Sequence, residues 1–207
     1  MITFIRSATS QVMATVKAKK AVIRKKIEGR IKTLSTEEKA RQSYGIVKKI
    51  LELKEYKDSN RISIYLSTDN EIDTEPIIRN IFETEKKCFV PRYHGKIMEM
   101  VRLHSMDDWE NLPLTKWNIK QPSVNDNREN ALETGGLDII ILPGVAFTKD
   151  GDRLGHGMGY YDKFLWNIRK TGKKKPYTVG IGFKEQIVDS LPIENTDYKL
   201  DSVLYEE

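Results

Sequence analysis

The sequence predicts a three-layer α/β fold in which a mainly parallel sheet is flanked by helices on both sides. The first observation is the apolar run at 137–143, which is continuous instead of alternating and is therefore typical of a strand buried on both faces. The second is the order of the next segments: a glycine-rich segment, a helical pattern at 160–170 and a strand at 177–183, as in a parallel βαβ unit. Ligands bind at the carboxyl ends of such strands, so the glycine-rich segment is the first place to look for a site.

The amino-terminal half supplies the helices and the first strand of this fold. Apolar residues at near-helical spacing among lysines predict a basic opening helix. A second helix is expected to start after Ser35, whose hydroxyl can cap the next turn, and to run to about Lys54. The β-rich segment at 61–67 is the first core strand, and another helix begins at Glu75, with Pro76 tolerated in its first turn.

The middle of the chain adds two strands and then loses its periodicity. Strands are expected at 88–91 and 98–103, joined by a turn at 94–96. From 107 to 136 the sequence becomes rich in Pro, Asn and Asp, which predicts surface loops around short pieces of structure.

The composition describes one soluble globular domain of 207 residues, which we treat as a single domain over 1–207. A hydrophobic fraction of 39% excludes a disordered chain, and no apolar run is long enough to span a bilayer. Lys and Arg outnumber Asp and Glu only 35 to 30, too small an excess for a dedicated nucleic-acid binder. Basic clusters at 17–30 and 170–175 could attract a polyanion such as a nucleotide, or could be solvated faces.

The single cysteine and the first residues bear on the cellular compartment. Cys88 cannot form an intramolecular disulfide, and its apolar neighbours predict a buried structural thiol in a reducing environment. The first 27 residues contain no acid, as in mitochondrial transit peptides, but a flexible tail over 1–16 before a basic helix is the favoured interpretation. We therefore expect a cytoplasmic protein, with mitochondrial import as the alternative.

The segment 152–162 holds three alternating glycines between the most buried strand and a helix. Glycines let the backbone turn tightly and bring its N–H groups against a ligand, while the helix start favours negative charge, so the pattern describes a phosphate cradle. Arg153 could donate a bidentate pair of hydrogen bonds to phosphate oxygens, and Asp162 could bind Mg²⁺. A plain tight turn and a helix-start charge are the alternatives. The loop has neither a Walker A ending nor the dinucleotide spacing of a Rossmann fingerprint.

Ordered sequence motifs along nearly the whole chain carry a family resemblance. Around the glycine loop stand Leu142-Pro143-Gly144-Val145-Ala146-Phe147, Arg153-Leu154-Gly155 and Gly159-Tyr160-Tyr161-Asp162. Elsewhere stand the segments 61–64, 91–93, 117–119, 135–138, 183–186 and 203–206. Together they resemble animal 5-formyltetrahydrofolate cyclo-ligases, also called methenyltetrahydrofolate synthetases. The resemblance implies a single α/β domain of NagB/RpiA-like, Rossmann-like topology.

The resemblance also implies the site residues. ATP would be bound by the opening helix and the glycine loop, through Lys20, Ala21, Val22, Ile23, Arg24, Arg153, Leu154, Gly155, His156, Gly157, Met158, Gly159, Tyr160 and Tyr161. Folate would be bound by Leu66, Glu71, Trp117, His156, Gly157, Met158, Gly159 and Tyr160. Asp162 and Asp197 would bind Mg²⁺, and Arg153 and Tyr160 would be catalytic. The spacing of Lys20 and Arg24 supports their role apart from the resemblance, since residues four apart lie on one helix face and could reach the same triphosphate.

The activity that the resemblance implies is the ATP- and Mg²⁺-dependent closure of 5-formyltetrahydrofolate to 5,10-methenyltetrahydrofolate through a phosphorylated formyl intermediate. The expected partners are ATP and the folate, with or without a polyglutamate tail, and the expected state is a monomer without nucleic acid or membrane. Basic side chains occupy the places of His156 and Met158 in some animal members. That departure supports the alternative of a catalytically impaired nucleotide- or folate-binding protein on the same fold.

Overall fold

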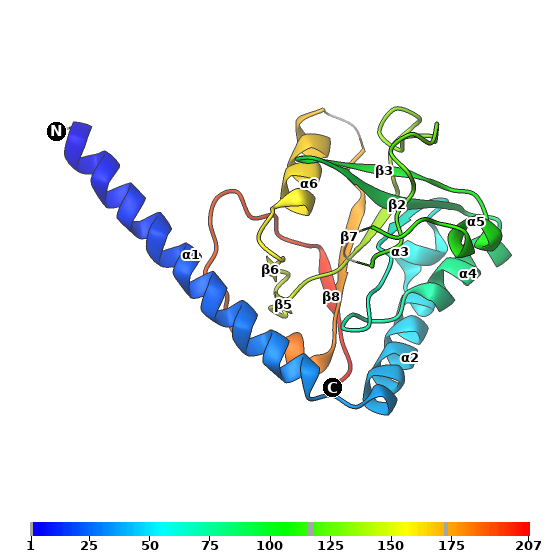
Figure 1. Ribbon diagram of the computed structural model, residues 1–207, viewed down its shortest axis with the longest axis horizontal. Helices are drawn as coiled ribbons and strands as arrows, with labels where there is room; N and C mark the ends of the chain where they lie inside the picture. The colour runs from blue at the N-terminus through cyan, green and yellow to red at the C-terminus, as the bar shows by residue number, and fades with distance from the viewer. Residues whose placement is uncertain (1, 116–117, 172–173) are drawn as a thin grey trace.

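The computed structural model describes residues 2–115, 118–171 and 174–207, with side chains from Thr15 onward. Its centre is a six-stranded sheet in the order β3-β2-β1-β4-β7-β8 (Figure 1). Every neighbouring pair is parallel except β2 and β3, which form an antiparallel hairpin. The strands are β1 (Arg61–Ile64), β2 (Lys87–His94), β3 (Ile97–Leu103), β4 (Ile139–Leu142), β7 (Tyr177–Ile181) and β8 (Ser202–Leu204). The predicted mainly parallel sheet is therefore confirmed.

Helices cover both faces of this sheet and make the three predicted layers. The helices are α1 (Ile2–Lys32), α2 (Thr36–Glu52), α3 (Lys54–Lys57), α4 (Glu75–Glu83), α5 (Met106–Glu110) and α6 (Tyr160–Lys170), and the 3₁₀ turn η1 (Lys184–Gln186) comes after them. The apolar residues of α2 and α4 pack on one face of the sheet, and those of α6 pack on the other. The βαβ order β4, α6, β7 is the unit that the sequence predicted.

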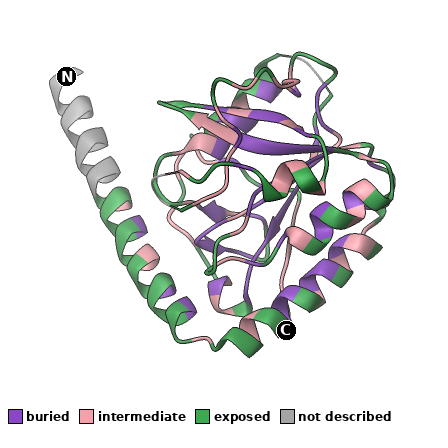
Figure 2. Ribbon diagram, turned by 45° about the vertical axis from the view of Figure 1, so that its right-hand side comes forward, coloured by how far each residue is buried: buried purple, intermediate pink, exposed green. Residues whose placement is uncertain are grey.

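The strand β4 explains why the apolar run is continuous. Ile139 and Ile141 belong to the core under α2 and α4, whereas Ile140 and Leu142 belong to the core under α6. All four side chains are fully buried because each face of β4 meets a layer of helices. Figure 2 shows this burial concentrated on the central strands and on the inner sides of the helices.

Helix α2 begins as predicted. The Ser35 hydroxyl accepts a hydrogen bond from the Glu38 amide at 3.2 Å. The Glu38 carboxylate does not reach back to complete a capping box, because it accepts instead from Arg41 and Gln42 on the next turn. These two donors lower the pKa of Glu38 to about 2.

Helix α1 is longer than the sequence indicated. The backbone is helical from Ile2, so the segment 1–16 that we expected as a flexible tail has helical backbone in its described part. Within the described chain, no helix is both long and apolar enough to cross a bilayer. The second half of α1 is anchored by Ile27 and Ile31, which are buried against the core shared with α2 and α4.

A small hairpin that the sequence did not predict links β4 to the glycine loop. Strand β5 (Ala146–Phe147) pairs antiparallel with β6 (Arg153–Leu154), and the Val145 amide donates to the Leu154 carbonyl at 2.7 Å. The hairpin brings the chain back to the carboxyl end of β4 before α6 begins. The glycine loop therefore lies where ligands bind in parallel sheets.

Candidate functional site

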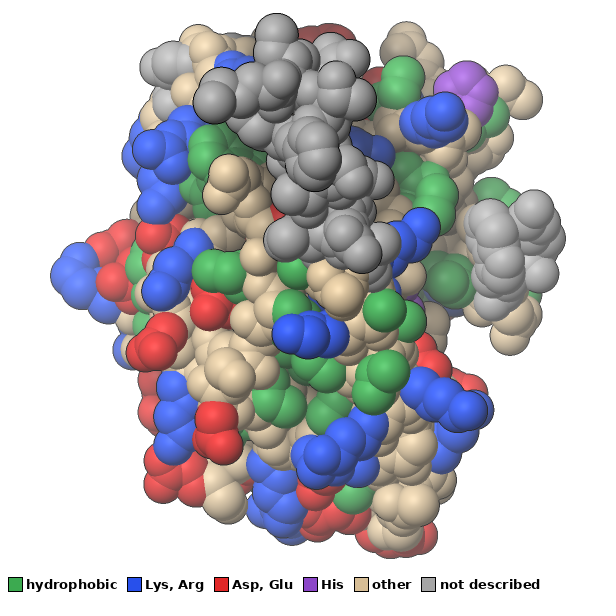
Figure 3. All heavy atoms as spheres, turned by 90° about the vertical axis from the view of Figure 1, so that its left-hand side faces the viewer, with side chains coloured by type: hydrophobic (Ala, Val, Ile, Leu, Met, Phe, Trp, Pro, Cys, Tyr) green, Lys and Arg blue, Asp and Glu red, His purple; other side chains and the backbone are tan. Residues whose placement is uncertain are grey.

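The glycine loop opens on a cleft of about 1940 Å³. Its walls are the second half of α1, the start of α6, the segment after β1 and the segment 194–197. Pockets for one drug-sized ligand measure roughly 300 to 1,000 Å³. This cleft therefore has room for two small molecules side by side. On the face shown in Figure 3, Lys and Arg side chains are interspersed with Asp and Glu, as the nearly balanced charge predicted.

The backbone of the loop is arranged to offer donors. Gly157 and Gly159 have φ values of +108° and +64°, a left-handed region that favours glycine. Gly159 is also the N-cap of α6 and gives no side-chain cap to the helix. Among the hydrogen bonds of the described chain, none is donated by the amides of residues 155–162. The loop is therefore a row of available N–H groups leading into a helix N-terminus.

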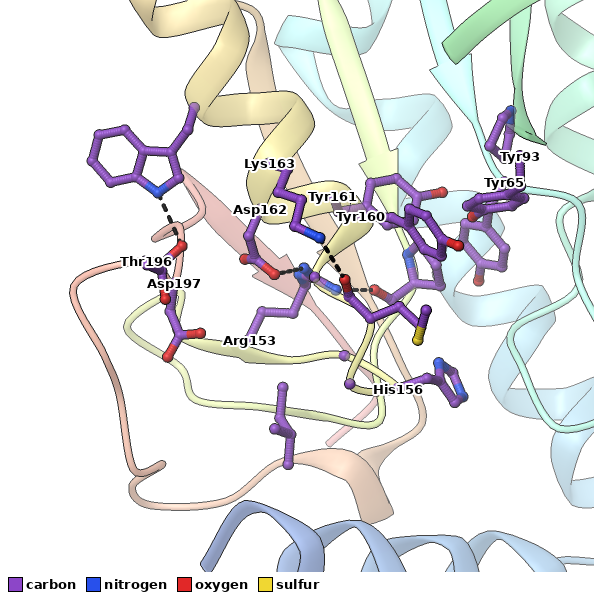
Figure 4. Close-up of a pocket in the computed structure, with 18 of the residues that line it drawn as sticks. Tyr65, Tyr93, Arg153, His156, Tyr160, Tyr161, Asp162, Lys163, Thr196 and Asp197 are labelled. Carbon is purple, nitrogen blue, oxygen red and sulfur yellow. Dashed lines mark hydrogen bonds and ion pairs between the residues drawn. The ribbon is translucent and has the colours of Figure 1, made fainter. Parts of the chain in front are cut away.

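Arg153 lies under the loop and is held by two partners (Figure 4). Its side chain is only 4% exposed, and Nη2 lies 3.1 Å from Asp162 Oδ2 while Nη1 donates to the Pro143 carbonyl at 3.3 Å. Its Nε is buried without a partner in the described chain. Asp162 also accepts from the Tyr198 amide through Oδ1. The guanidinium thus joins the end of β4 to the first turn of α6.

Lys20 makes a second buried ion pair, between α1 and the segment 194–197. Its ammonium lies 2.8 Å from Glu194 Oε2 and 2.6 Å from Asp197 Oδ2, and the lysine is 8% exposed. Burial acts to lower the pKa of Lys20, but the hydrogen bonds to Asp197 and Glu194 outweigh it and raise this pKa above its usual value. The cation stays charged, and it ties α1 to the segment 194–197.

The five residues of α1 predicted for ATP binding divide into two groups. Lys20 and Arg24 line the cleft, and Arg24 Nε donates to the Gly155 carbonyl at 2.7 Å. Ala21 and Val22 are exposed and do not line it, and Ile23 packs against the core. The spacing of four residues therefore picked out the side of the helix that faces the loop.

Tyrosines gather at the other end of the cleft from Asp197 (Figure 4). The rings of Tyr93 and Tyr160 contact each other with centroids 4.9 Å apart, and the Tyr160 hydroxyl donates to the Gly95 carbonyl at 2.8 Å. Tyr65 and Leu66, just after β1, line the same end. Burial raises the pKa of Tyr93 to about 12, so its hydroxyl is neutral. This end suits a flat, partly apolar ligand.

Glu71 is the acid of the tyrosine end. Its Oε2 accepts from the amide and the hydroxyl of Thr68, at 2.9 and 3.0 Å. Loss of hydration raises the pKa of Glu71, although these two donors and the nearby His156 act to lower it. Glu71 thus presents a carboxyl group of weakened acidity beside the glycine loop, since both line the cleft.

Most residues predicted for the site meet in this one cleft, and several others join them. The predicted residues that line it are Lys20, Arg24, Leu66, Glu71, Asp197 and all residues from Arg153 to Asp162. Trp117 lies outside the described residues. Residues that the sequence reasoning missed include Tyr65, Tyr93, Lys163, Trp166 and Glu194. Tyr93 could have been found, because it shares one face of β2 with Phe89 and Pro91.

The acids of the cleft do not form a closed metal cage. Among the described residues, no group of three or more His, Cys, Asp or Glu side chains converges on one point. Asp162 and Asp197 nevertheless supply oxygen ligands at neighbouring places in the cleft lining, because Asp162 Oδ1 accepts from the amide of Tyr198, the residue after Asp197. Such a set fits Mg²⁺, which is usually held by one or two carboxylates and completed by phosphate oxygens and water.

The fold and the cleft define an α/β protein with a glycine loop at the end of a buried parallel strand and space for two ligands. The model of the 5-formyltetrahydrofolate cyclo-ligase family matches residues 16–206. The chain is 47% identical over 195 residues to a mouse 5-formyltetrahydrofolate cyclo-ligase, covering 93% of this chain and 96% of the mouse protein. The chain therefore belongs to the 5-formyltetrahydrofolate cyclo-ligase family, which is a family of enzymes.

Solved structures agree with this assignment. An Aquifex aeolicus 5,10-methenyltetrahydrofolate synthetase superposes with a TM-score of 0.73 at 30% identity, covering 89% of this chain and 88% of that one. A Mycoplasma pneumoniae 5,10-methenyltetrahydrofolate synthetase gives a TM-score of 0.69 at 22% identity, covering 91% and 99%, which shows the shared fold.

Proposed function

We propose that this chain converts 5-formyltetrahydrofolate and ATP into 5,10-methenyltetrahydrofolate, ADP and phosphate. The observation that carries the proposal is the row of amides at 155–162, which lines the cleft and donates to no described residue. Membership of the cyclo-ligase family supplies the substrate class. The room for two ligands is also consistent with a reaction between two small molecules.

The chemistry needs a leaving group. The N5 formyl carbon is amide-like and a poor electrophile, so direct attack by N10 with loss of water would be slow. We propose that the formyl oxygen attacks the γ-phosphorus of ATP and ADP leaves, which gives a phosphorylated iminium carbon. N10 then attacks that carbon and loses its proton, and the carbon–oxygen bond breaks as phosphate departs. No nucleophilic side chain is required.

The residues of the cleft would act by positioning and by neutralising charge. The loop amides and Arg153 would donate to the phosphate oxygens, with Lys20 and Arg24 reaching them from α1. Asp162 and Asp197 would hold Mg²⁺, which when bound neutralises charge on the transferring phosphoryl group. Arg153 is suited to this role because its guanidinium is already fixed on Asp162 and Pro143.

The folate would occupy the tyrosine end. Its flat rings would pack on Tyr160, with Leu66 as an apolar contact and Glu71 as the polar one. The family resemblance adds Trp117, which lies outside the described residues. The Tyr160 hydroxyl is bound to the Gly95 carbonyl, so in this proposal Tyr160 contributes its ring and its place next to the loop.

The alternative is a binding protein that has lost turnover, suggested by His156 and Met158. Both side chains are exposed, and Met158 is 60% exposed. Neither donates or accepts a hydrogen bond through its side chain in the described chain. The loop backbone therefore does not depend on these two side chains, which favours the catalytic proposal.

Turnover by the pure protein decides between the two. Incubation with 5-formyltetrahydrofolate and MgATP should produce methenyl absorbance and phosphate in a one-to-one ratio, each dependent on the other substrate. A binding protein would retain both ligands in equilibrium dialysis and produce neither signal. Asp162→Ala should abolish most turnover while the circular dichroism spectrum stays that of the parent.

We also propose a cytoplasmic monomer that accepts folates with or without a polyglutamate tail. The location is supported by the single buried thiol, and imaging of a carboxyl-terminal fluorescent fusion tests it against mitochondrial import. Light scattering tests the monomer. A comparison of KM for monoglutamate and pentaglutamate substrates tests the preference for tails.

A further inference from the structure

Each of the two acids proposed as Mg²⁺ ligands already forms an ion pair with a basic side chain of the protein. Asp162 Oδ2 lies 3.1 Å from Nη2 of Arg153, and Asp197 Oδ2 lies 2.6 Å from Nζ of Lys20. Arg153 and Lys20 are also the cations proposed for the triphosphate. The two pairs come from four separate parts of the chain: α1, β6, α6 and the segment 194–197.

The Lys20 pair is the tighter of the two. Its ammonium touches a second carboxylate, Glu194, at 2.8 Å, and the Glu194 amide donates to the same Oδ2 of Asp197 at 2.7 Å. One cation and two acids thus form a compact set in which the lysine is buried, at 8% exposed, while the side chains of Glu194 and Asp197 are 28% and 22% exposed. A divalent ion that approaches Asp197 Oδ2 meets an ammonium already in place.

We propose that Lys20 is an internal counter-ion that blocks Asp197 until a triphosphate draws it away, so that the metal ion and the nucleotide must enter together. The inference rests on the proposed function for its ligands. Free Mg²⁺ has to displace Lys20 without giving it a new partner. ATP without a metal ion would form ion pairs with Lys20 and Arg153. Asp197 and Asp162 would then have no cationic partner and would lie beside the phosphates, where like charges repel. MgATP supplies new partners for Lys20, Arg153, Asp197 and Asp162 in one step, and only Glu194, whose side chain is 28% exposed, has to turn to solvent.

The exchange predicts that removing a lysine improves the binding of a metal ion. Lys20→Met leaves Asp197 without its ammonium, and nucleotide-free protein should then bind Mn²⁺ alone more tightly. We expect the dissociation constant for Mn²⁺ to fall about tenfold. The same variant should bind MgATP more weakly than the parent, because a phosphate partner is lost.

The test is a Mn²⁺ titration of the full chain without nucleotide, read out by electron paramagnetic resonance. Lys19→Met is the matched control, since it removes the same charge from an exposed neighbour on α1 that does not line the cleft. Lys20→Gln is a second variant that keeps a hydrogen-bond donor, in case the methionine disturbs the docking of α1. Adding Asp197→Asn to Lys20→Met identifies the carboxylate responsible.

The inference is supported if both Lys20 variants bind Mn²⁺ more tightly, Lys19→Met does not, and Asp197→Asn removes the gain. It is overturned if the Lys20 variants bind Mn²⁺ like the parent, or if the gain survives Asp197→Asn. If the parent protein turns over folate but the Lys20 variants fail this test, the proposed function stands and only the counter-ion role of Lys20 is refuted. If the parent protein shows no turnover but the Lys20 variants bind Mn²⁺ as expected, the counter-ion role stands and the proposed function is refuted.

Discussion

Gly157 is the position where the smallest chemical change tests the glycine loop. A Cβ at Gly157 would lie 3.7 Å from Cζ of Arg24, an ordinary contact, so Gly157→Ala costs energy through its φ of +108° and not through a clash. Holding a non-glycine residue in such a region costs about 1–3 kcal/mol. The chain can relieve this strain by turning the peptides on either side, which rotates the amides that we assign to phosphate.

The size of the expected effect comes from that cost. Since 1.4 kcal/mol corresponds to a factor of ten, the dissociation constant for a non-hydrolysable MgATP analogue should rise roughly 5- to 150-fold. Isothermal titration calorimetry measures this, and thermal unfolding reports any strain that remains in the fold. Gly29→Ala is the control, because Gly29 is helical with open space around it and should gain about 0.5–1 kcal/mol of stability without affecting the nucleotide. Wild-type affinity and wild-type unfolding of Gly157→Ala would refute the role of the loop.

Three further predictions concern single side chains. Arg153→Lys should lower kcat about 10²-fold, because a lysine cannot hold Asp162 and the Pro143 carbonyl with separate nitrogens, and losing one of these buried bonds should lower the free energy of unfolding by about 1 kcal/mol. Steady-state kinetics that stay within a few-fold of the parent would contradict it. Glu71→Gln should raise the unfolding temperature at neutral pH, because burial raises the pKa of Glu71 and makes its charged form costly in the folded state. This gain in unfolding temperature should vanish below the ordinary carboxyl pKa, and a gain that grows in acid would contradict the prediction. The Cys88 thiol, whose pKa burial raises to about 12, should react with a disulfide reagent only after unfolding in denaturant, and rapid reaction of the native protein would show that it is accessible.

The sequence predicted the parts of the fold that depend on local patterns. The continuous apolar run became β4, the helical pattern at 160–170 became α6 with the same bounds, and Ser35 caps α2. In each case a nearby pattern is sufficient, since burial on both faces, helical periodicity and a capping hydroxyl all act within a few residues. The glycine loop was found for the same reason.

The remaining features depend on contacts between distant residues. Lys20 and Asp197 are 177 positions apart, and nothing near either of them indicates that they form an ion pair. The hairpin of β5 and β6 is too short to leave a strand pattern, at two residues in each strand. Tyr160 was predicted as a site residue, but the bond from its hydroxyl to Gly95 crosses 65 positions and could not be expected from sequence.

A structure with a non-hydrolysable MgATP analogue and 5-formyltetrahydrofolate bound would test the central claim most directly. We predict the terminal phosphates against the amides of 155–159, with the formyl oxygen facing the γ-phosphorus and the folate rings on Tyr160. A triphosphate bound away from the loop, or a folate whose formyl group points away from the nucleotide, would contradict it.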